Sequence, residues 1–229
     1  MRTNPVPVRP VSRPPGFSLV ELLTVIAIIS VLMTVSVVGL NSLSGAKGVG
    51  TGVSTSEAVF EEARSLAVGR RTNAAVLISA QDPENRDTYL RRMLVVYKEV
   101  DPVTNQQQGD WKIHSRGATL PERVYFSRSL SKRNHKTGTG TIATTSLSGV
   151  GRDYSGEYYI YEFNSEGIST TPGASFVIGT GARSPGDKNP RVMASAKKDF
   201  GGFVIFRNGG TASFKDPEQI PVPNNIKTF

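Results

Sequence analysis

The sequence predicts an α+β protein in which a long apolar N-terminal helix precedes a head of mostly antiparallel strands. Two observations support this prediction. Residues 22–46 carry no charged side chain, and their apolar part, Leu22–Leu40, is about as long as the roughly 20-residue helix that crosses a bilayer. Beyond Arg71 the apolar residues change from helical spacing to two-residue alternation, which is typical of strands.

The residues before the apolar run are basic. Arg2, Arg9 and Arg13 precede it and no acidic residue does, so the positive-inside bias places the N-terminus in the cytoplasm. A cleaved signal peptide is one alternative, but its apolar core is shorter and ends in an Ala-x-Ala-like site, which is missing after Leu40. An ordinary uncleaved signal anchor is the other alternative. In our interpretation the apolar run is a helix that crosses the membrane once and stays attached to the head.

Glu21 places a carboxylate at the N-terminal end of the apolar run. An ionisable residue on the apolar side of a membrane boundary is costly, and it marks a functional site whose partner should be named. If the chain were cut after Gly16, the amine of Phe17 would lie one helical turn from Glu21. The pair could act within one helix, near the positive end of its dipole, or between neighbouring subunits.

These residues resemble the class III signal of type IV pilins and type II secretion pseudopilins, through Gly16–Leu23 (GFSLVELL) and Val25–Ile28 (VIAI). The resemblance implies cleavage between Gly16 and Phe17 by a prepilin peptidase and N-methylation of Phe17. It also implies that Glu21 sets subunit register in a filament. The implied partners are other pilins or pseudopilins, an assembly ATPase with its platform protein, and a bacterial inner membrane with the head in the periplasm.

Composition divides the chain into four segments. We expect a leader peptide at 1–16, a transmembrane and assembly helix at 17–40, a Gly-rich hinge at 41–53 and a periplasmic α+β head at 54–229. Five glycines between Gly39 and Gly52 predict that the helix breaks or loosens there, with a plain linker as an equal alternative.

The head begins with a second predicted helix, Ser56–Gly69, because Ser54–Glu57 has capping-box spacing and an apolar stripe follows it. Seven strands follow by alternation. They are Ala74–Ser79, Leu90–Glu99, Trp111–His114, Arg123–Ser127, Glu157–Asn164, Ala174–Ile178 and Gly202–Arg207.

The head resembles that of H-type minor pseudopilins and FimT-type minor pilins. The resemblance rests on four segments: Ala58–Leu77, Trp111 with Leu120–Phe126, Phe163–Gly167 and Phe203–Thr211. Long inserts, above all Ser127–Gly156, and the tail after Phe214 depart from that pattern.

The insert is basic. Six Lys or Arg residues and no acid lie between Arg123 and Arg152, among Gly, Ser and Thr, which predicts a mobile basic loop. Resemblance to FimT-type proteins implies DNA binding there, and the candidates are Arg128, Lys132, Arg133 and Lys136. A solvated loop, or one that docks an acidic neighbouring subunit, is the alternative.

Little in the sequence indicates catalysis. The chain has no cysteine, and neither His114 nor His135 has a Ser or carboxylate pattern that suggests a triad. The segment 82–87 (DPENRD) has acids but lacks calcium-loop spacing, so a polar turn is favoured. We expect no enzyme activity, cofactor or metal, and a minor pseudopilin. The alternatives are a type IV minor pilin that binds DNA for uptake and a signal-anchored surface adhesin or enzyme.

Overall fold

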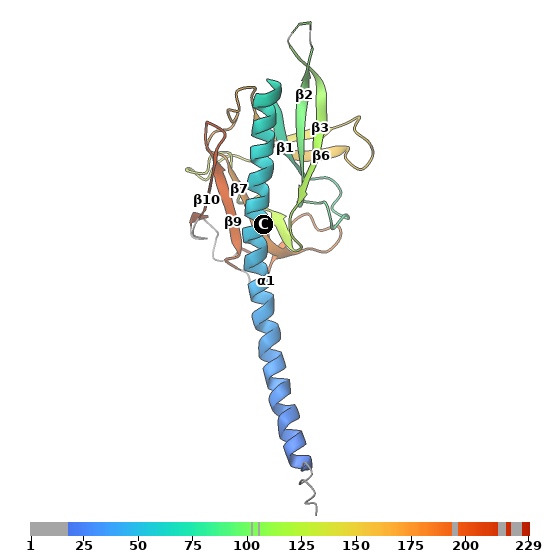
Figure 1. The fold of residues 1–229 in the computed structure, drawn as a ribbon, viewed down its shortest axis with the longest axis vertical. Helices are drawn as coiled ribbons and strands as arrows, with labels where there is room; N and C mark the ends of the chain where they lie inside the picture. The colour runs from blue at the N-terminus through green and yellow to red at the C-terminus, as the bar shows by residue number, and fades with distance from the viewer. Residues whose placement is uncertain (1–17, 102, 105, 194–196, 215–218, 221–225) are drawn as a thin grey trace, which may run out of the picture. The chain divides into compact units, whose positions relative to one another are not determined.

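The computed structural model describes residues 18–229 apart from 102, 105, 194–196, 215–218 and 221–225; the side chains of 31, 33–47 and 108 are also outside the description. The chain divides into two compact units, Met1–Asn41 and Ser42–Phe229 (Figure 1), and each is treated separately. The second unit is called the head below.

The helix α1 (Leu19–Arg70) contributes to both units. The break expected in the Gly-rich segment 41–53 is absent, because these residues are helical, and the expected second helix is the C-terminal part of α1. Glycine costs about 1 kcal/mol in a helix, but here it permits close packing. A Cβ on Gly52 would lie only 2.8 Å from Cδ1 of Ile178. The flexible hinge itself stays a prediction.

The C-terminal end of α1 has the hydrogen bonds of a Schellman motif. The N–H of Thr72 donates to the carbonyl of Ala67 at 3.1 Å, and that of Arg71 donates to Val68 at 3.3 Å. Arg71 occupies the left-handed position with φ of 53°. This motif turns the chain directly into the first strand.

Ten strands occur in the described part of the head, and all their pairings are antiparallel. The first sheet has the order β3-β2-β1-β6-β5 and the second the order β10-β9-β7-β4, with β8 beside β7. Their bounds are β1 (Ala74–Ser79), β2 (Arg92–Val100), β3 (Gln107–Thr119), β4 (Val124–Phe126), β5 (Thr144–Leu147), β6 (Gly156–Phe163), β7 (Ser175–Ala182), β8 (Arg191–Val192), β9 (Phe200–Ile205) and β10 (Thr211–Ser213).

The α+β class is therefore confirmed, with one correction. Sequence alternation predicted one mostly antiparallel sheet, whereas the strands form two. All seven predicted strands exist, and β1 has the predicted bounds. The strands β5, β8 and β10 were not predicted, because each has at most four residues and little apolar alternation.

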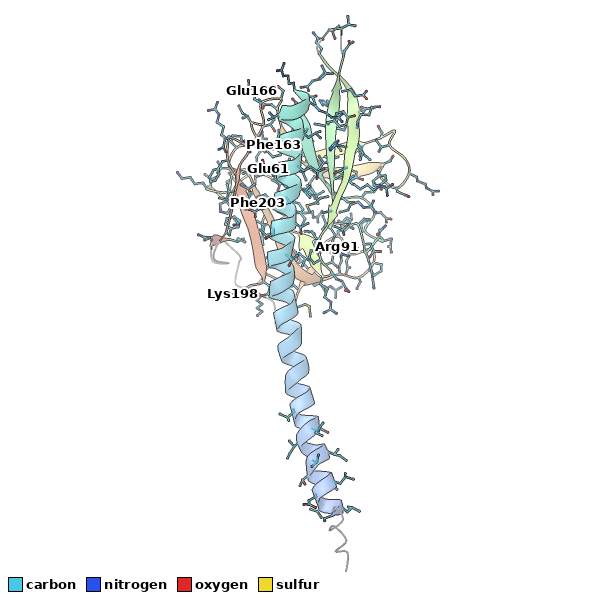
Figure 2. The ribbon with its side chains drawn as sticks, in the orientation of Figure 1. Glu61, Arg91, Phe163, Glu166, Lys198 and Phe203 are labelled. Atoms are coloured by element: carbon cyan, nitrogen blue, oxygen red, sulfur yellow. The ribbon has the colours of Figure 1, made fainter. Side chains whose placement is uncertain are left out.

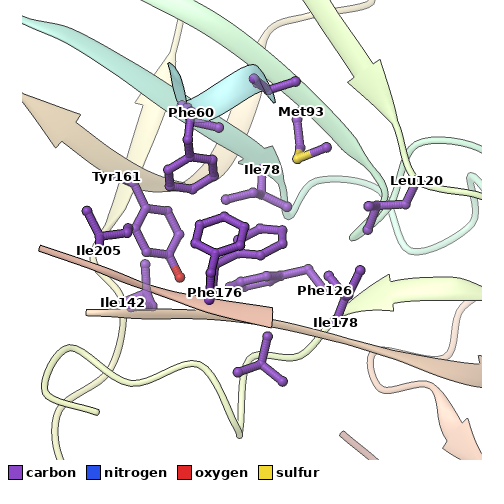
Figure 3. Close-up of a cluster of buried hydrophobic side chains, with 14 of the residues drawn as sticks. Phe60, Ile78, Met93, Leu120, Phe126, Ile142, Tyr161, Phe176, Ile178 and Ile205 are labelled. Atoms are coloured by element: carbon purple, nitrogen blue, oxygen red, sulfur yellow. The ribbon is translucent and has the colours of Figure 1, made fainter. Parts of the chain in front are cut away.

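The main core lies where the C-terminal part of α1 meets both sheets (Figure 3). Phe60 on α1 is fully buried, and its ring contacts Tyr161 of the first sheet at 5.1 Å and Phe203 of the second at 5.0 Å between centroids. Phe163 and Phe203, labelled in Figure 2, both lie along this part of the helix. One aromatic side chain thus links three elements.

The central strand of the first sheet, β1, is buried on both faces. Ala74, Val76 and Ile78 of β1 belong to the main core, whereas Ala75 and Leu77 belong to a second, smaller cluster. Trp111, only 8% exposed, is part of that cluster, and the ammonium of Lys98 lies 5.1 Å from its ring centroid. This double burial explains why β1 is a continuous apolar run.

Candidate functional site

The predicted cleavage site, Gly16 and Phe17, lies outside the described residues, which begin at Ser18. The first described residues form a capping box at the start of α1. The Glu21 carboxylate accepts a hydrogen bond from the N–H of Ser18 at 3.1 Å, and the Ser18 hydroxyl accepts one from the N–H of Val20 at 3.3 Å.

This arrangement fixes where the Glu21 carboxylate lies. It is held at the N-terminal end of the helix, where unpaired N–H groups and the helix dipole favour negative charge. The residue that it bonds, Ser18, directly follows Phe17 in the chain. A positive group on Phe17 would therefore be one residue from the donor that Glu21 already engages.

The described residues around Glu21 expose large apolar side chains. Leu19 is 77% exposed, Val20 68% and Ile28 60%, and these positions fall on different sides of the helix. A helix that is apolar on all sides requires an apolar environment, either lipid or other helices.

Among the described residues, no helix combines the length and apolar character that crossing a membrane requires. The predicted span Leu22–Leu40 includes residue 31 and residues 33–40, whose side chains are outside the description.

In the head, the beginning of the segment predicted as a mobile basic loop is held by hydrogen bonds, whereas the mobility of the segment stays a prediction. Its beginning follows the edge of β7: the N–H of Ser127 donates to Val177 at 2.8 Å, and Lys132 and Ser175 exchange two bonds. Ser127 and Ser131 are fully buried. These two serines pair with β7, whereas most residues from 133 to 149 are exposed.

Residues 132–140, called the basic hairpin below, form a tight reversal within this segment. Arg133 donates its N–H to Gly140 at 3.1 Å, and Asn134 and Thr139 form a β-bridge with bonds of 3.0 and 3.2 Å. The hairpin therefore places Lys132, Arg133 and Lys136 in one short element, with the last two exposed.

Arg128, the fourth basic candidate, is held differently. Its guanidinium donates to the hydroxyl of Tyr159 at 3.5 Å and to the side-chain oxygen of Asn189. It lies before the hairpin and ties the segment to neighbouring elements. We therefore assign Arg128 a structural position and keep the three hairpin cations as the candidates for an acidic partner.

His135 lies within the basic hairpin, beside an aromatic ring. Its ring lies 4.8 Å from the ring of Phe214 between centroids, and burial lowers the pKa of His135 below its usual 6.5. The unfolded chain therefore takes up the proton first on acidification. The stability from neutral His135 is complete above pH 6.5 and is lost as the pH falls through the folded-state pKa.

We thus expect the melting temperature to fall between about pH 7 and pH 5, and to fall less in His135→Gln. Thermal unfolding of both proteins across this range measures the difference. Identical pH profiles would show that His135 is not coupled to folding.

The segment 82–87 forms the polar turn that its sequence predicts. The N–H of Asn85 donates to the carbonyl of Asp82 at 3.0 Å, and the Asp82 carboxylate accepts from the N–H of Glu84 at 3.1 Å. No group of three His, Cys, Asp or Glu side chains placed to hold a metal occurs in the described part of the chain.

Comparison with known proteins bears on the N-terminal region. The prokaryotic N-terminal methylation motif matches residues 13–37, a stretch that contains Gly16, Phe17 and Glu21. The match supports a type IV pilin-like or pseudopilin-like protein. No curated protein and no solved structure matches the chain significantly. The resemblance of the head to H-type and FimT-type proteins stays a prediction.

Sequence reasoning missed one feature of this region. It used capping-box spacing at Ser54–Glu57 but not at Ser18–Glu21, where the same Ser-x-x-Glu pattern opens the helix.

Proposed function

We propose that the chain is a minor pseudopilin subunit of a type II secretion-like filament, inserted as a prepilin, cleaved between Gly16 and Phe17 and N-methylated at Phe17. The observation that carries this proposal is the methylation motif at residues 13–37. The capping box supports it, because it holds the Glu21 carboxylate beside the segment where the new amine would form.

In this proposal the N-terminal part of α1 first anchors the subunit in a bacterial inner membrane, with the head in the periplasm. Its exposed apolar side chains are compatible with lipid before assembly and with other helices after it. An assembly ATPase, acting through a platform protein, extracts the subunit into the filament. The charge pair of Glu21 with the Phe17 amine of a neighbouring subunit then fixes the register, since an unpaired buried charge is costly.

The proposal predicts that the chain enters filaments only when the machine is active. Filaments sheared from the native host should contain the chain, and deletion of the assembly ATPase should leave it in the membrane fraction. The same chain detected equally in sheared material with and without the ATPase would contradict assembly. Immunoblotting of both fractions, with a cytoplasmic protein as lysis control, makes the measurement.

A second candidate function, DNA binding for uptake, is favoured by the basic hairpin, which presents three cations in one ordered element. Phosphate contacts from Lys and Arg are electrostatic, so affinity should fall steeply with salt. Electrostatic binding of this kind needs no contact that is specific to a nucleobase.

Replacing Lys132, Arg133 and Lys136 with Gln should weaken duplex DNA binding and reduce the salt slope by about 1 for each phosphate that the variant no longer neutralises. The measurement is binding of a fluorescent duplex to the detergent-solubilised full chain at several salt concentrations. The matched control replaces three exposed cations elsewhere, Lys112, Arg116 and Lys188, with Gln. Equal weakening in both triple variants would show that the affinity for DNA depends on net charge alone and that the hairpin is not the binding site.

A further inference from the structure

A polar cavity of about 430 Å³ lies in the head, away from the basic hairpin. Its walls come from the turn that follows β1, from the start of β2 and from the segment that precedes β6. Its volume lies in the lower part of the range of small-ligand sites, about 300–1,000 Å³. Four charged residues line it: Arg92, Arg152, Asp82 and Asp153.

One wall is held in place by the side chains around Tyr154. Arg92 donates a hydrogen bond to the carbonyl of Asp153 at 3.0 Å, and its guanidinium lies 5.3 Å from the centroid of the Tyr154 ring. The hydroxyl of Tyr158, a buried residue, donates to the carbonyl of Tyr154 at 2.6 Å. The segment that precedes β6 is therefore fixed before any ligand arrives.

A second part of the wall, the turn that carries Asp82 and Asn85, is held by Arg183, which is only 8% exposed. Its guanidinium donates to the carbonyls of Pro83 and Asn85, the latter at 2.9 Å, and lies 4.8 Å from the centroid of the Tyr89 ring. This internal cation holds the turn that carries Asp82 and Asn85. A preformed cavity lowers the entropy cost of binding.

The chemistry of the walls limits the class of ligand. Two guanidinium groups and two carboxylates balance in charge, so neither an anion nor a metal cation is favoured. The polar walls offer little to an apolar ligand. Among the described residues, the Oδ1 of Asn85 accepts from the N–H groups of Asp87 and Thr88. The side-chain NH₂ group of Asn85 can therefore donate hydrogen bonds to a ligand, and the carboxylates of Asp82 and Asp153 can accept them.

We propose that this cavity binds a neutral polyhydroxylated ligand, such as one monosaccharide unit of a glycan. Each hydroxyl of a sugar both donates and accepts, which matches a wall that carries donors and acceptors with no net charge. Arg152 is exposed at the cavity and supplies donors in a planar fork suited to two adjacent oxygens. The inference does not depend on assembly, because the cavity lies wholly within the head.

Saturation-transfer difference NMR on the full chain tests this proposal. The chain should be solubilised in a detergent without a sugar headgroup, because a glycoside detergent would compete. The probes are glucose, galactose and N-acetylglucosamine, each at about 10 mM, which is tenfold above a 1 mM dissociation constant. Acetate and alanine serve as anionic and zwitterionic probes.

We expect saturation transfer to at least one sugar, and a reduction of at least about fivefold in Arg152→Ser and in Asp153→Asn. Arg116→Ser removes the same charge from an exposed position on β3 and should keep the full signal. Melting temperatures of all variants establish that they are folded. Three results would overturn the proposal: no transfer to any sugar, equal transfer in Arg152→Ser and Arg116→Ser, or transfer to acetate or alanine alone.

Discussion

Replacement of Glu21 with alanine should remove the protein from filaments while cleavage after Gly16 and membrane insertion continue. The carboxylate has two tasks in this account: it caps α1 through the N–H of Ser18, and it pairs with the Phe17 amine of a neighbouring subunit. The fraction of chain in sheared filaments should fall at least about tenfold, since loss of a buried charge partner costs more than the 1.4 kcal/mol that tenfold represents.

Two further variants separate the two tasks of Glu21. Glutamine keeps the capping geometry but not the charge, so Glu21→Gln should fail to assemble like the alanine variant. Ser18→Ala removes the capping hydroxyl but keeps the charge, and it should assemble with at most a small loss, because a cap contributes only about 1 kcal/mol. Normal incorporation of Glu21→Gln would show that capping, not charge, is what the filament needs.

Phe60→Ala should destabilise the head by about 3–5 kcal/mol. The ring is fully buried and contacts aromatic rings of both sheets, Tyr161 of the first at 5.1 Å and Phe203 of the second at 5.0 Å between centroids. Its removal would leave a cavity where α1 and the two sheets meet, and the backbone of three elements cannot collapse into it without disrupting the packing around it.

Urea unfolding of the full chain in a mild detergent measures this destabilisation. Trp111 is the single tryptophan, and it lies in the second cluster of the head, so its fluorescence reports unfolding of that unit. Phe206→Ala is the matched control, because Phe206 is 51% exposed and its removal should cost less than about 1 kcal/mol. Equal destabilisation by the two substitutions would refute the assignment of Phe60 to the centre of the core.

The elements with strong local signals were predictable from the sequence. The strand β1 was located to the residue, because a short apolar run lies between polar residues at Thr72–Asn73 and Gln81–Asp82. The helical part of the head was also predicted, and its end, placed at Gly69, differs from the observed Arg70 by one residue. These features depend on residues near one another in the chain.

Features that depend on contacts between residues far apart in the chain were not predictable from the sequence. In the Gly-rich segment, which is helical, Gly48 and Gly52 lie close to side chains more than sixty positions away, including Ile178 beside Gly52. The beginning of the basic segment is held in place because Ser127 and Ser131 pair with Val177 on β7. Composition alone suggested flexibility in both places, because it carries no information about such partners.

The candidate site residues also include some that the sequence could predict and some that it could not. Glu21 was singled out because a carboxylate beside an apolar run is costly, and the structure adds its hydrogen bond to Ser18. The separate role of Arg128 could not be inferred, because Tyr159 and Asn189 are 31 and 61 residues away in the chain.

Processing as a prepilin is best tested by the mass of the N-terminal peptide of the protein isolated from membranes of its native host. We expect a peptide that begins with N-methylated Phe17 and lacks residues 1–16. A peptide that still begins at Met1 would mean an uncleaved signal anchor, and the filament subunit proposed here would be excluded.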